Sequence, residues 1–411
     1  MTVHRIPAGR PTLSAMKWVA LVWFLLCVGC CVRIFLQPLK GSVYSNYSQA
    51  GRAWVNGADP YDIDREGGER VLPVMSGYRY SPPVSVLFVP FSLFPDRYAN
   101  VLWRMVSYLG YSGALIWFLR VVLPGGAAMT DKEKALFWLL LIPLSLGSMN
   151  NGQANVLLMA LMLAACAAVV EKRWNLSAAF LAGAVLLKLY PLAIAMLLIV
   201  VYPRQLGWRF LLALAIGLLI PFALQRPAYV LHQYDNWFLL LRNEDRTEFA
   251  MNAGLRDFYL LTRYFGVPMA AKLYLGLRLL TAALVAGVGL LGRLRGWPEN
   301  RLVATQLTLG CAWLAVFGPV VESCTFILIS APLAWSLVDS FQPGRSLGSK
   351  LILLLVLAMF LLPGIAGWFP EGAEKVYILQ PLAALLFLLD RFTRSVGIRP
   401  SLLHFRLTQP S

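Results

Sequence analysis

Long apolar stretches separated by short polar segments are the feature that most constrains this chain of 411 residues. Segments such as 156–170 and 351–362 are apolar on every side, whereas strands of a membrane β-barrel alternate in hydrophobicity over about 10 residues. Helices also satisfy their own backbone hydrogen bonds in lipid. Only 14% of the residues are charged and 59% are hydrophobic, against about 25% charged in soluble domains. The sequence therefore predicts an all-α, polytopic membrane protein.

The apolar stretches predict one integral-membrane domain, residues 1–411, with about twelve transmembrane helices, since a span needs about 20 mainly apolar residues. The expected spans are 16–36, 100–123, 135–149, 154–170, 176–187, 191–202, 208–224, 269–291, 302–319, 323–338, 350–364 and 376–389. Two assignments have alternatives. Segment 82–94 is short and contains Pro90, so an interfacial or re-entrant helix is favoured over a short span. Segment 176–202 contains Lys188 and Pro191, so it forms two short helices or one kinked helix.

The distribution of charge predicts the orientation in the membrane. The net charge of +16 lies mainly in the short loops, whereas the two long loops, 37–97 and 225–268, contain equal numbers of basic and acidic residues. Because cytoplasmic loops are enriched in Lys and Arg, the short loops and both termini are expected on the cytoplasmic side of the cell (inner) membrane. The long loops are then outer loops, and prolines and glycines indicate that the first one is a structured, turn-rich segment rather than a helix. A basic charge placed in this way does not indicate nucleic-acid binding.

Lys188 is the most informative single residue, because it lies between apolar residues and far from any polar loop. A cation within the membrane is costly unless it has a partner. The functional interpretation is a ligand for an anion, such as the phosphate of a lipid-linked substrate. Pro191 would end the helix and make room for such a site. The alternative is a lysine that extends along apolar surface to the membrane interface.

A run of amides precedes the apolar stretch 156–170. Asn151, Gln153 and Asn155, together with Asn150, are more amides than one helix cap requires. We expect the first three to line a polar cavity. The alternative is a helix cap combined with hydrogen bonds between helices.

The first outer loop combines carboxylates with aromatic rings. Asp59, Tyr61 and Asp62 lie close together, and Arg79 and Tyr80 follow near the end of the loop. This combination suits a carbohydrate, because rings stack on sugar faces and carboxylates accept protons from hydroxyl groups. The alternative for Asp59 is turn formation next to a proline.

The second outer loop has a similar composition. Asp245 is followed by Arg246, and Asp257 is preceded by Arg256, among several aromatic residues. A solvated interfacial segment is the alternative. Glu322, at the expected outer end of a span, is a further candidate acid that could line the site.

Several common chemistries have no signature in the sequence. There is no Gly-x-x-x-x-Gly-Lys-Ser/Thr phosphate loop, and the chain contains three histidines and no His/Cys cluster of metal-ligand spacing. We therefore expect neither a metal site nor a cofactor, and ATP-driven mechanisms are disfavoured.

A set of short motifs resembles a known family over residues 41–209. The motifs are Tyr47, Ala50 and Arg52-Ala53-Trp54 followed by Gly57-x-Asp59-Pro60-Tyr61; Tyr80-Ser81-Pro82-Pro83 before a helix ending in Phe94-Pro95; Gly152-Gln153-x-Asn155-x-Leu157-Leu158; Ala182-Gly183; and Lys188-Leu189-Tyr190-Pro191. Together they resemble glycosyltransferase family 87, of the GT-C superfamily.

The resemblance implies a polytopic enzyme that moves mannose or another hexose from a polyprenyl-phosphate carrier to an acceptor, with inversion, on the outer face of the membrane. By the same resemblance, Lys188 would bind the donor phosphate, and Arg79 and Arg256 are further basic candidates for it. The expected lining residues are Tyr47, Tyr80, Asn151, Gln153, Asn155, Tyr190 and Glu322. The expected partners are the lipid-linked donor, a lipid or glycan acceptor and membrane lipids.

The sequence departs from the family pattern at the catalytic base. The family usually has an aspartate about four residues before the tyrosine that matches Tyr47, and residues 42–46 contain no acid. Another carboxylate would then be the base. We rank Asp62 and Asp59 above Asp257 and Asp245, because an adjacent arginine makes a carboxylate less basic.

Two other classes of function compete with the transferase. A flippase or secondary transporter of lipid-linked substrates would explain the number of spans and the buried polar groups, but would favour paired halves with matching broken helices. A non-catalytic relative would explain the missing aspartate.

Overall fold

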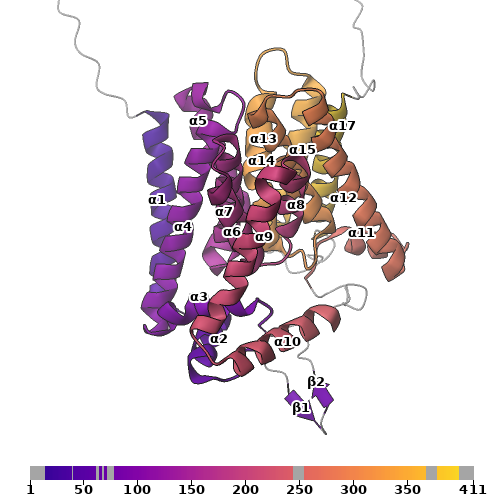
Figure 1. The fold of residues 1–411 in the computed structure, drawn as a ribbon. Helices are drawn as coiled ribbons and strands as arrows, with labels where there is room; N and C mark the ends of the chain where they lie inside the picture. The colour runs from indigo at the N-terminus through magenta and orange to yellow at the C-terminus, as the bar shows by residue number, and fades with distance from the viewer. Residues whose placement is uncertain are drawn as a thin grey trace, which may run out of the picture.

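The computed structural model describes residues 14–38, 40–61, 64–66, 69–71, 78–243, 254–366 and 377–397. Its main body is a bundle of antiparallel helices (Figure 1). The bundle helices are α1 (Ala15–Leu36), α4 (Asp96–Val121), α5 (Asp131–Asn151), α6 (Asn155–Val170), α7 (Trp174–Leu187), α8 (Leu192–Val201), α9 (Pro203–Leu219), α12 (Ala271–Leu294), α13 (Glu299–Phe317), α14 (Ile327–Ser340), α15 (Leu347–Ala366) and α17 (Leu379–Val396).

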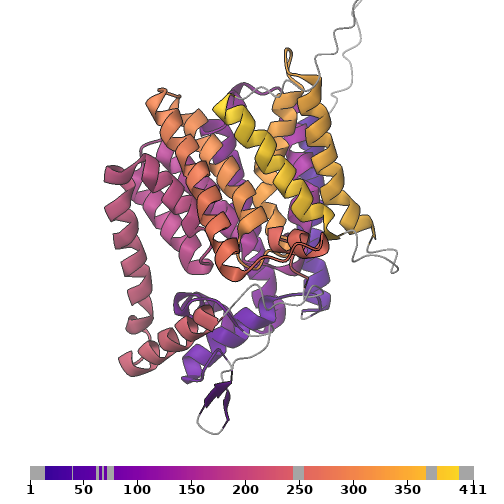
Figure 2. The same ribbon diagram turned by 90° about the vertical axis from the view of Figure 1, so that its right-hand side faces the viewer.

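The two ends of the bundle differ in construction (Figures 1 and 2). One end, here called the loop end, carries the short elements α2 (Tyr44–Asn56), α3 (Pro82–Ser92), α10 (Pro227–Asn243) and α11 (Phe258–Tyr264), the 3-10 turns η2 (Ile220–Ala223) and η4 (Ser323–Phe326), and an antiparallel hairpin of β1 (Asp64–Glu66) and β2 (Glu69–Val71). At the other end, the turn end, α1 begins, α17 ends and short connections join the helices, one of which includes η1 (Gly126–Ala128).

The helical fold class agrees with the sequence prediction, apart from the small hairpin. The expectation that the first long loop is turn-rich rather than helical is wrong, because α2 forms there and only ends at Gly57, whose φ angle is +68°. Each of the predicted spans overlaps one bundle helix. Within the described residues, four helices are long and apolar enough to cross a membrane by length and composition: Ala15–Leu36, Pro203–Ala223, Ala271–Leu294 and Ser323–Ser340. The protein is therefore a membrane protein, and the number of about twelve spans stays a prediction.

Burial separates helices at the centre of the bundle from those at its surface. In the most apolar window, 83% of Ser323–Ser340 is buried, against 22% for α1 and for α12. The exposed faces of α1 and α12 carry large apolar side chains such as Phe24 and Leu279, as a lipid-facing surface should. At the centre, α6 buries a run of small residues, 164–168, which allows neighbouring helices to approach closely.

The two uncertain segments are resolved by the structure. Segment 176–202 forms two helices, α7 and α8, because Lys188 adopts an extended conformation (φ −150°, ψ 144°) and Pro191 precedes the first turn of α8. The two helices run in opposite directions (Figure 1). Lys188, between them, lies at the loop end, where it contacts the ring of Tyr80. The short segment 82–94 forms α3, which packs beside α2 at the same end rather than in the bundle.

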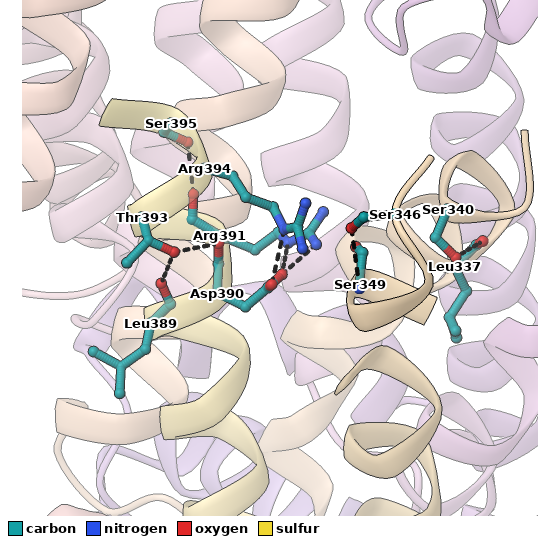
Figure 3. A network of polar contacts seen from close by, with 10 residues as sticks. All are labelled: Leu337, Ser340, Ser346, Ser349, Leu389, Asp390, Arg391, Thr393, Arg394 and Ser395. Carbon is teal, nitrogen blue, oxygen red and sulfur yellow. Dashed lines mark hydrogen bonds and ion pairs between the residues drawn. The ribbon is translucent and has the colours of Figure 1, made fainter. Parts of the chain in front are cut away.

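Polar contacts at the turn end are mostly local. The buried Asp390 carboxylate on α17 accepts hydrogen bonds from Arg391 and Arg394 of the same helix. Figure 3 shows these guanidinium groups extending toward the turn that carries Ser346 and Ser349. These bonds therefore stabilise the C-terminal part of α17 itself.

Candidate functional site

The tyrosines of the first loop form a compact aromatic cluster at the loop end. Tyr47 of α2 is fully buried, stacks on Phe88 of α3 at 4.7 Å and contacts Trp103 of α4 edge-on at 5.9 Å. Its hydroxyl group lies 2.8 Å from that of Tyr80 and accepts a hydrogen bond from the N–H of Ala154 at 3.1 Å. One side chain thus joins the first loop to the turn between α5 and α6.

Lys188 lies directly beside this cluster. Its Nζ atom is 5.6 Å from the ring centre of Tyr80 and 5.9 Å from that of Tyr190, distances typical of cation–π contacts. The position is fixed by Ser81, whose hydroxyl donates to the carbonyl of Leu186 at 2.5 Å. Among the residues that the structure describes, no carboxylate forms an ion pair with Lys188.

Burial and the neighbouring groups act on the pKa of Lys188 in opposite directions. Burial alone lowers the pKa of the ammonium group, but Tyr190, Tyr47, Cys324 and Glu322 more than offset this, and the pKa of Lys188 lies above its ordinary value. A charged, unpaired lysine among aromatic rings can bind an anion.

The connection between α13 and α14 forms another wall. Asn155 donates to the carbonyl of Cys324 at 3.2 Å and accepts from the Tyr190 hydroxyl at 3.0 Å. Glu322 is the N-cap residue of η4, is exposed, and accepts from the Cys324 thiol at 3.2 Å. It is also close enough to act on the charge of Lys188. We call Tyr47, Tyr80, Asn155, Lys188, Tyr190 and Glu322 the Lys188 cluster.

Val320, two residues before Glu322, has an unusual backbone conformation. Its φ angle is +48°, which is strained for a β-branched residue. Such strain costs of the order of 1–3 kcal/mol and occurs most often at functional sites. The strained residue lies directly before the segment that carries Glu322 and Cys324, which both act on the pKa of Lys188.

Arg256 and Asp257 lie next to this wall. The N–H of Arg256 donates to the carbonyl of Val321 at 2.6 Å, and its guanidinium group lies 4.1 Å from the ring centre of Tyr377 and donates to Gln380. Asp257 is completely buried and caps α11 by accepting from the N–H of Leu260 at 3.0 Å. Arg256 is therefore near Glu322, whereas Asp257 has a structural role in the cap.

Asp59 is engaged on both carboxylate oxygens. One accepts from the N–H of Tyr61 at 2.9 Å and the other from the Asn236 amide of α10 at 2.8 Å. The first contact is the expected turn, and the second shows that the two long loops meet. Tyr61 extends the link to the cluster, because its hydroxyl donates to the carbonyl of Tyr80 at 2.9 Å. Asp62 and Asp245, two other predicted acids, lie outside the described residues.

The structure shows different roles for the amide residues before α6, which were expected either to line a polar cavity or to cap the helix and bond between helices. Asn155 does not cap α6, whose N-cap residue is Ala154, and instead joins Tyr190 to Cys324. Gln153 is only 6% exposed, and its Oε1 atom has no hydrogen-bond partner in the described structure. The backbone carbonyl of Asn151 accepts from the N–H of Val43. Arg79, the remaining basic candidate, is half-buried directly before Tyr80 in the chain.

Two arginines that the sequence analysis missed hold this turn in place. Arg104 of α4 is completely buried and donates to the carbonyl of Asn150 at 2.8 Å, and Arg33 of α1 donates to the same carbonyl at 2.9 Å. Both cations lie at the C-terminus of α5, where the helix dipole is negative. An arginine inside an apolar segment is the signal that could have identified Arg104.

No group of three or more potential metal ligands occurs among the described residues. The Lys188 cluster brings together an unpaired cation, several aromatic rings and an exposed carboxylate, that of Glu322. This set can bind a phosphate, stack on a sugar ring and accept a proton.

Comparisons with known proteins give a family and distantly similar solved structures. The model of Glycosyltransferase family 87 matches residues 78–319, more than half of the chain. No curated protein matches the chain. Among solved structures, the crystal structure of ArnT from Cupriavidus metallidurans bound to undecaprenyl phosphate is similar, with 14% identity over 92% of this chain and 78% of that chain. Its TM-score of 0.36 is too low to assign a common fold.

Proposed function

Because the chain belongs to glycosyltransferase family 87, we propose that it transfers a hexosyl, mannose-like residue from a polyprenyl-phosphate sugar to a hydroxyl group of an acceptor. The transfer inverts the anomeric centre, needs no metal ion and takes place at the loop end, on the outer face of the cell membrane. The turn end, with its basic turns, then faces the cytoplasm.

The observation that carries this proposal is the environment of Lys188. A lysine that has no ion-pair partner among the described residues and is flanked by the rings of Tyr80 and Tyr190 is suited to bind a phosphate beside a sugar. Its place at the end of two short, apolar helices suits a phosphate attached to a lipid tail. As the anomeric C–O bond breaks, negative charge grows on this phosphate, and Lys188 stabilises it.

The proposed base is Glu322, which is the exposed carboxylate of the Lys188 cluster. The acceptor oxygen attacks the anomeric carbon, its proton passes to Glu322, and the polyprenyl phosphate departs with the electron pair of the broken bond. Asp59 and Asp257 are less suited, since Asp59 is bound by Asn236 of the second long loop and Asp257 is completely buried.

The test is a transfer assay with membranes that contain the full chain and a radiolabelled polyprenyl-phosphate mannose. Lys188→Met removes the charge and keeps the side-chain length. Lys272→Met, at an exposed position at the start of α12, is the matched control. We expect Lys188→Met to lower the rate by roughly 30- to 1000-fold, as for loss of one group that stabilises a transition-state charge.

Each outcome separates the competing classes. Labelled acceptor product that depends on Lys188 and not on Lys272 supports the transferase. Lipid-linked sugar that crosses vesicle membranes unchanged, with no product, supports a transporter instead. Equal transfer rates in both variants would refute the phosphate-binding role of Lys188.

A further inference from the structure

A second polar site lies at the turn end, opposite the Lys188 cluster. A surface cavity of about 340 Å³ opens where the connection between α6 and α7 meets the first turns of α9. Its lining residues are Lys172, Arg173, Trp174, Asn175, Leu176 and Arg209. Its volume is at the lower end of the range for small-ligand pockets, roughly 300–1,000 Å³.

Positive charge dominates this cavity. Lys172 has no ion-pair partner among the described residues. Arg209 donates only to neutral oxygens, Asn175 Oδ1 and the carbonyl of Gln205, both at 2.8 Å. Two acids lie nearby without lining the cavity: Glu171 is 3.7 Å from the largely exposed Arg173, and Glu299 is hydrogen-bonded to Tyr202, which contacts Trp174. The lining residues themselves include three cations and no carboxylate, so the lining carries a net positive charge.

Lys172 occupies a position where glycine is normally found. Two hydrogen bonds close the C-terminus of α6: the N–H of Lys172 donates to the carbonyl of Val169, and the N–H of Arg173 donates to the carbonyl of Ala168. In this type of helix end, the residue in the left-handed conformation is usually glycine. Here that residue is Lys172, with φ +58°. The strain places an ammonium group on the cavity that glycine would not supply.

Aromatic side chains of the types that favour a membrane interface lie next to the cavity. Trp174 contacts Tyr202 at 5.4 Å between ring centres, and the guanidinium group of Arg209 lies 4.4 Å from the ring of Trp208, which is 55% exposed. Tryptophan and tyrosine concentrate where acyl chains meet headgroups. An anion bound here is thus within reach of the bilayer.

We propose that this cavity binds the phosphate of an anionic phospholipid headgroup, such as phosphatidylglycerol, in the leaflet at the turn end. Lys172, Arg173 and Arg209 supply the charge. The N–H groups in the first turn of α7, which no side chain caps, supply further donors. Free phosphate has the same chemistry, but the interfacial aromatics favour a lipid as its source.

The test is native mass spectrometry of the full-length protein released from nanodiscs that contain phosphatidylglycerol and phosphatidylcholine. The cavity variant is Lys172→Ala/Arg173→Ala/Arg209→Ala. The control, Lys132→Ala/Lys134→Ala/Arg295→Ala, removes the same charge from the turn end outside the cavity. Each basic residue that is removed should weaken the affinity for phosphatidylglycerol roughly fivefold. The parent and the control should therefore retain one phosphatidylglycerol molecule that the cavity variant loses. Equal retention in all three proteins would overturn the proposal.

A single substitution guards against a folding defect. Lys172→Gly removes the charge and relieves the left-handed strain, so it should raise the melting temperature in detergent while it weakens phosphatidylglycerol retention roughly fivefold. Unchanged retention in this stable variant would contradict the role of Lys172. Inorganic phosphate is the second probe: if it binds in a cavity-dependent way and phosphatidylglycerol does not, the ligand is a soluble anion and the lipid assignment is wrong.

Discussion

The loop end and the turn end of the bundle show two ways of placing charge in a membrane protein. At the loop end, Lys188 is surrounded by rings and held by contacts between distant parts of the chain, such as Ser81 with Leu186. At the turn end, pairs such as Asp390 with Arg394 lie within one helical turn. The first arrangement holds a single cation in a fixed position where a ligand can bind it, and the second places several basic groups along the edge of the bundle. The difference teaches that net charge alone says little about where chemistry takes place.

The largest expected effect concerns the sides on which the two ends lie. Single cysteines at Lys272 and Arg295 mark opposite ends of α12 and are exposed. An impermeant maleimide on intact cells should label Lys272→Cys fully and Arg295→Cys only after permeabilisation. The parent, with its own cysteines, sets the background. Labelling of Arg295→Cys in intact cells would reverse the proposed orientation.

The next effect separates the carboxylates of the two ends. Glu322→Gln keeps the size and an acceptor oxygen for Cys324 but removes the proposed base. Transfer should fall by roughly 100- to 10,000-fold, as for general acid–base groups. The control is Glu133→Gln at the turn end, where Glu133 forms a capping box with Thr130. If Glu322→Gln transfers sugar at the parent rate, the base is a different carboxylate.

A smaller effect compares one glycine at each end. Gly152 (φ +71°) lies so close to Arg104 that a Cβ atom would be 2.8 Å from its guanidinium group, whereas a Cβ atom at Gly296 (φ +64°) would meet nothing within 4 Å. Gly296→Ala should cost about 1 kcal/mol of unfolding free energy, from the backbone alone. Gly152→Ala should cost about 2–4 kcal/mol, because crowding adds to this. Unfolding in detergent measures both, and equal losses would show that Arg104 moves freely.

The smallest effect concerns exposed ion pairs, which occur at both ends of the bundle. Arg52 pairs with Asp96 at the loop end and Arg345 with Asp339 at the turn end, each at 2.6 Å with partly exposed side chains. Arg52→Ala and Arg345→Ala should each cost about 1 kcal/mol or less, since water screens such pairs. A much larger loss for Arg52→Ala alone would mean that this pair belongs to the framework of the site.

Hydropathy predicted the bundle helices well but placed several starts too late, and it missed the less apolar helices α2, α10 and α11 in the long loops. The expected spans at 100 and 135 begin at Asp96 and Asp131 in the structure, because the first turns are polar. The capping box of Thr130 and Glu133 was the overlooked signal. The break at Lys188 was predictable, since a lysine and a proline interrupt an apolar segment.

The details of the site were harder to predict, because its partners carry no sequence signature. Arg104 and Arg33 bind a backbone carbonyl, which every residue has. Asp59 looked available as a base until Asn236, which lies 177 residues later, was seen to bind it. Glu322 was identified as a candidate acid, but its position near Lys188 depends on the turn at Val320.

The wide sequence separation of the contacts around Lys188 has a consequence for biosynthesis. Ser81 and its acceptor Leu186 are 105 residues apart, and Asn155 and Cys324 are 169 residues apart. At a synthesis rate of about 5–20 residues per second, roughly 8–34 s pass between the synthesis of Asn155 and that of its hydrogen-bond acceptor, Cys324. A nascent chain that stalls before η4 therefore presents the aromatic side chains of the first loop to the insertion machinery with their polar framework unfinished.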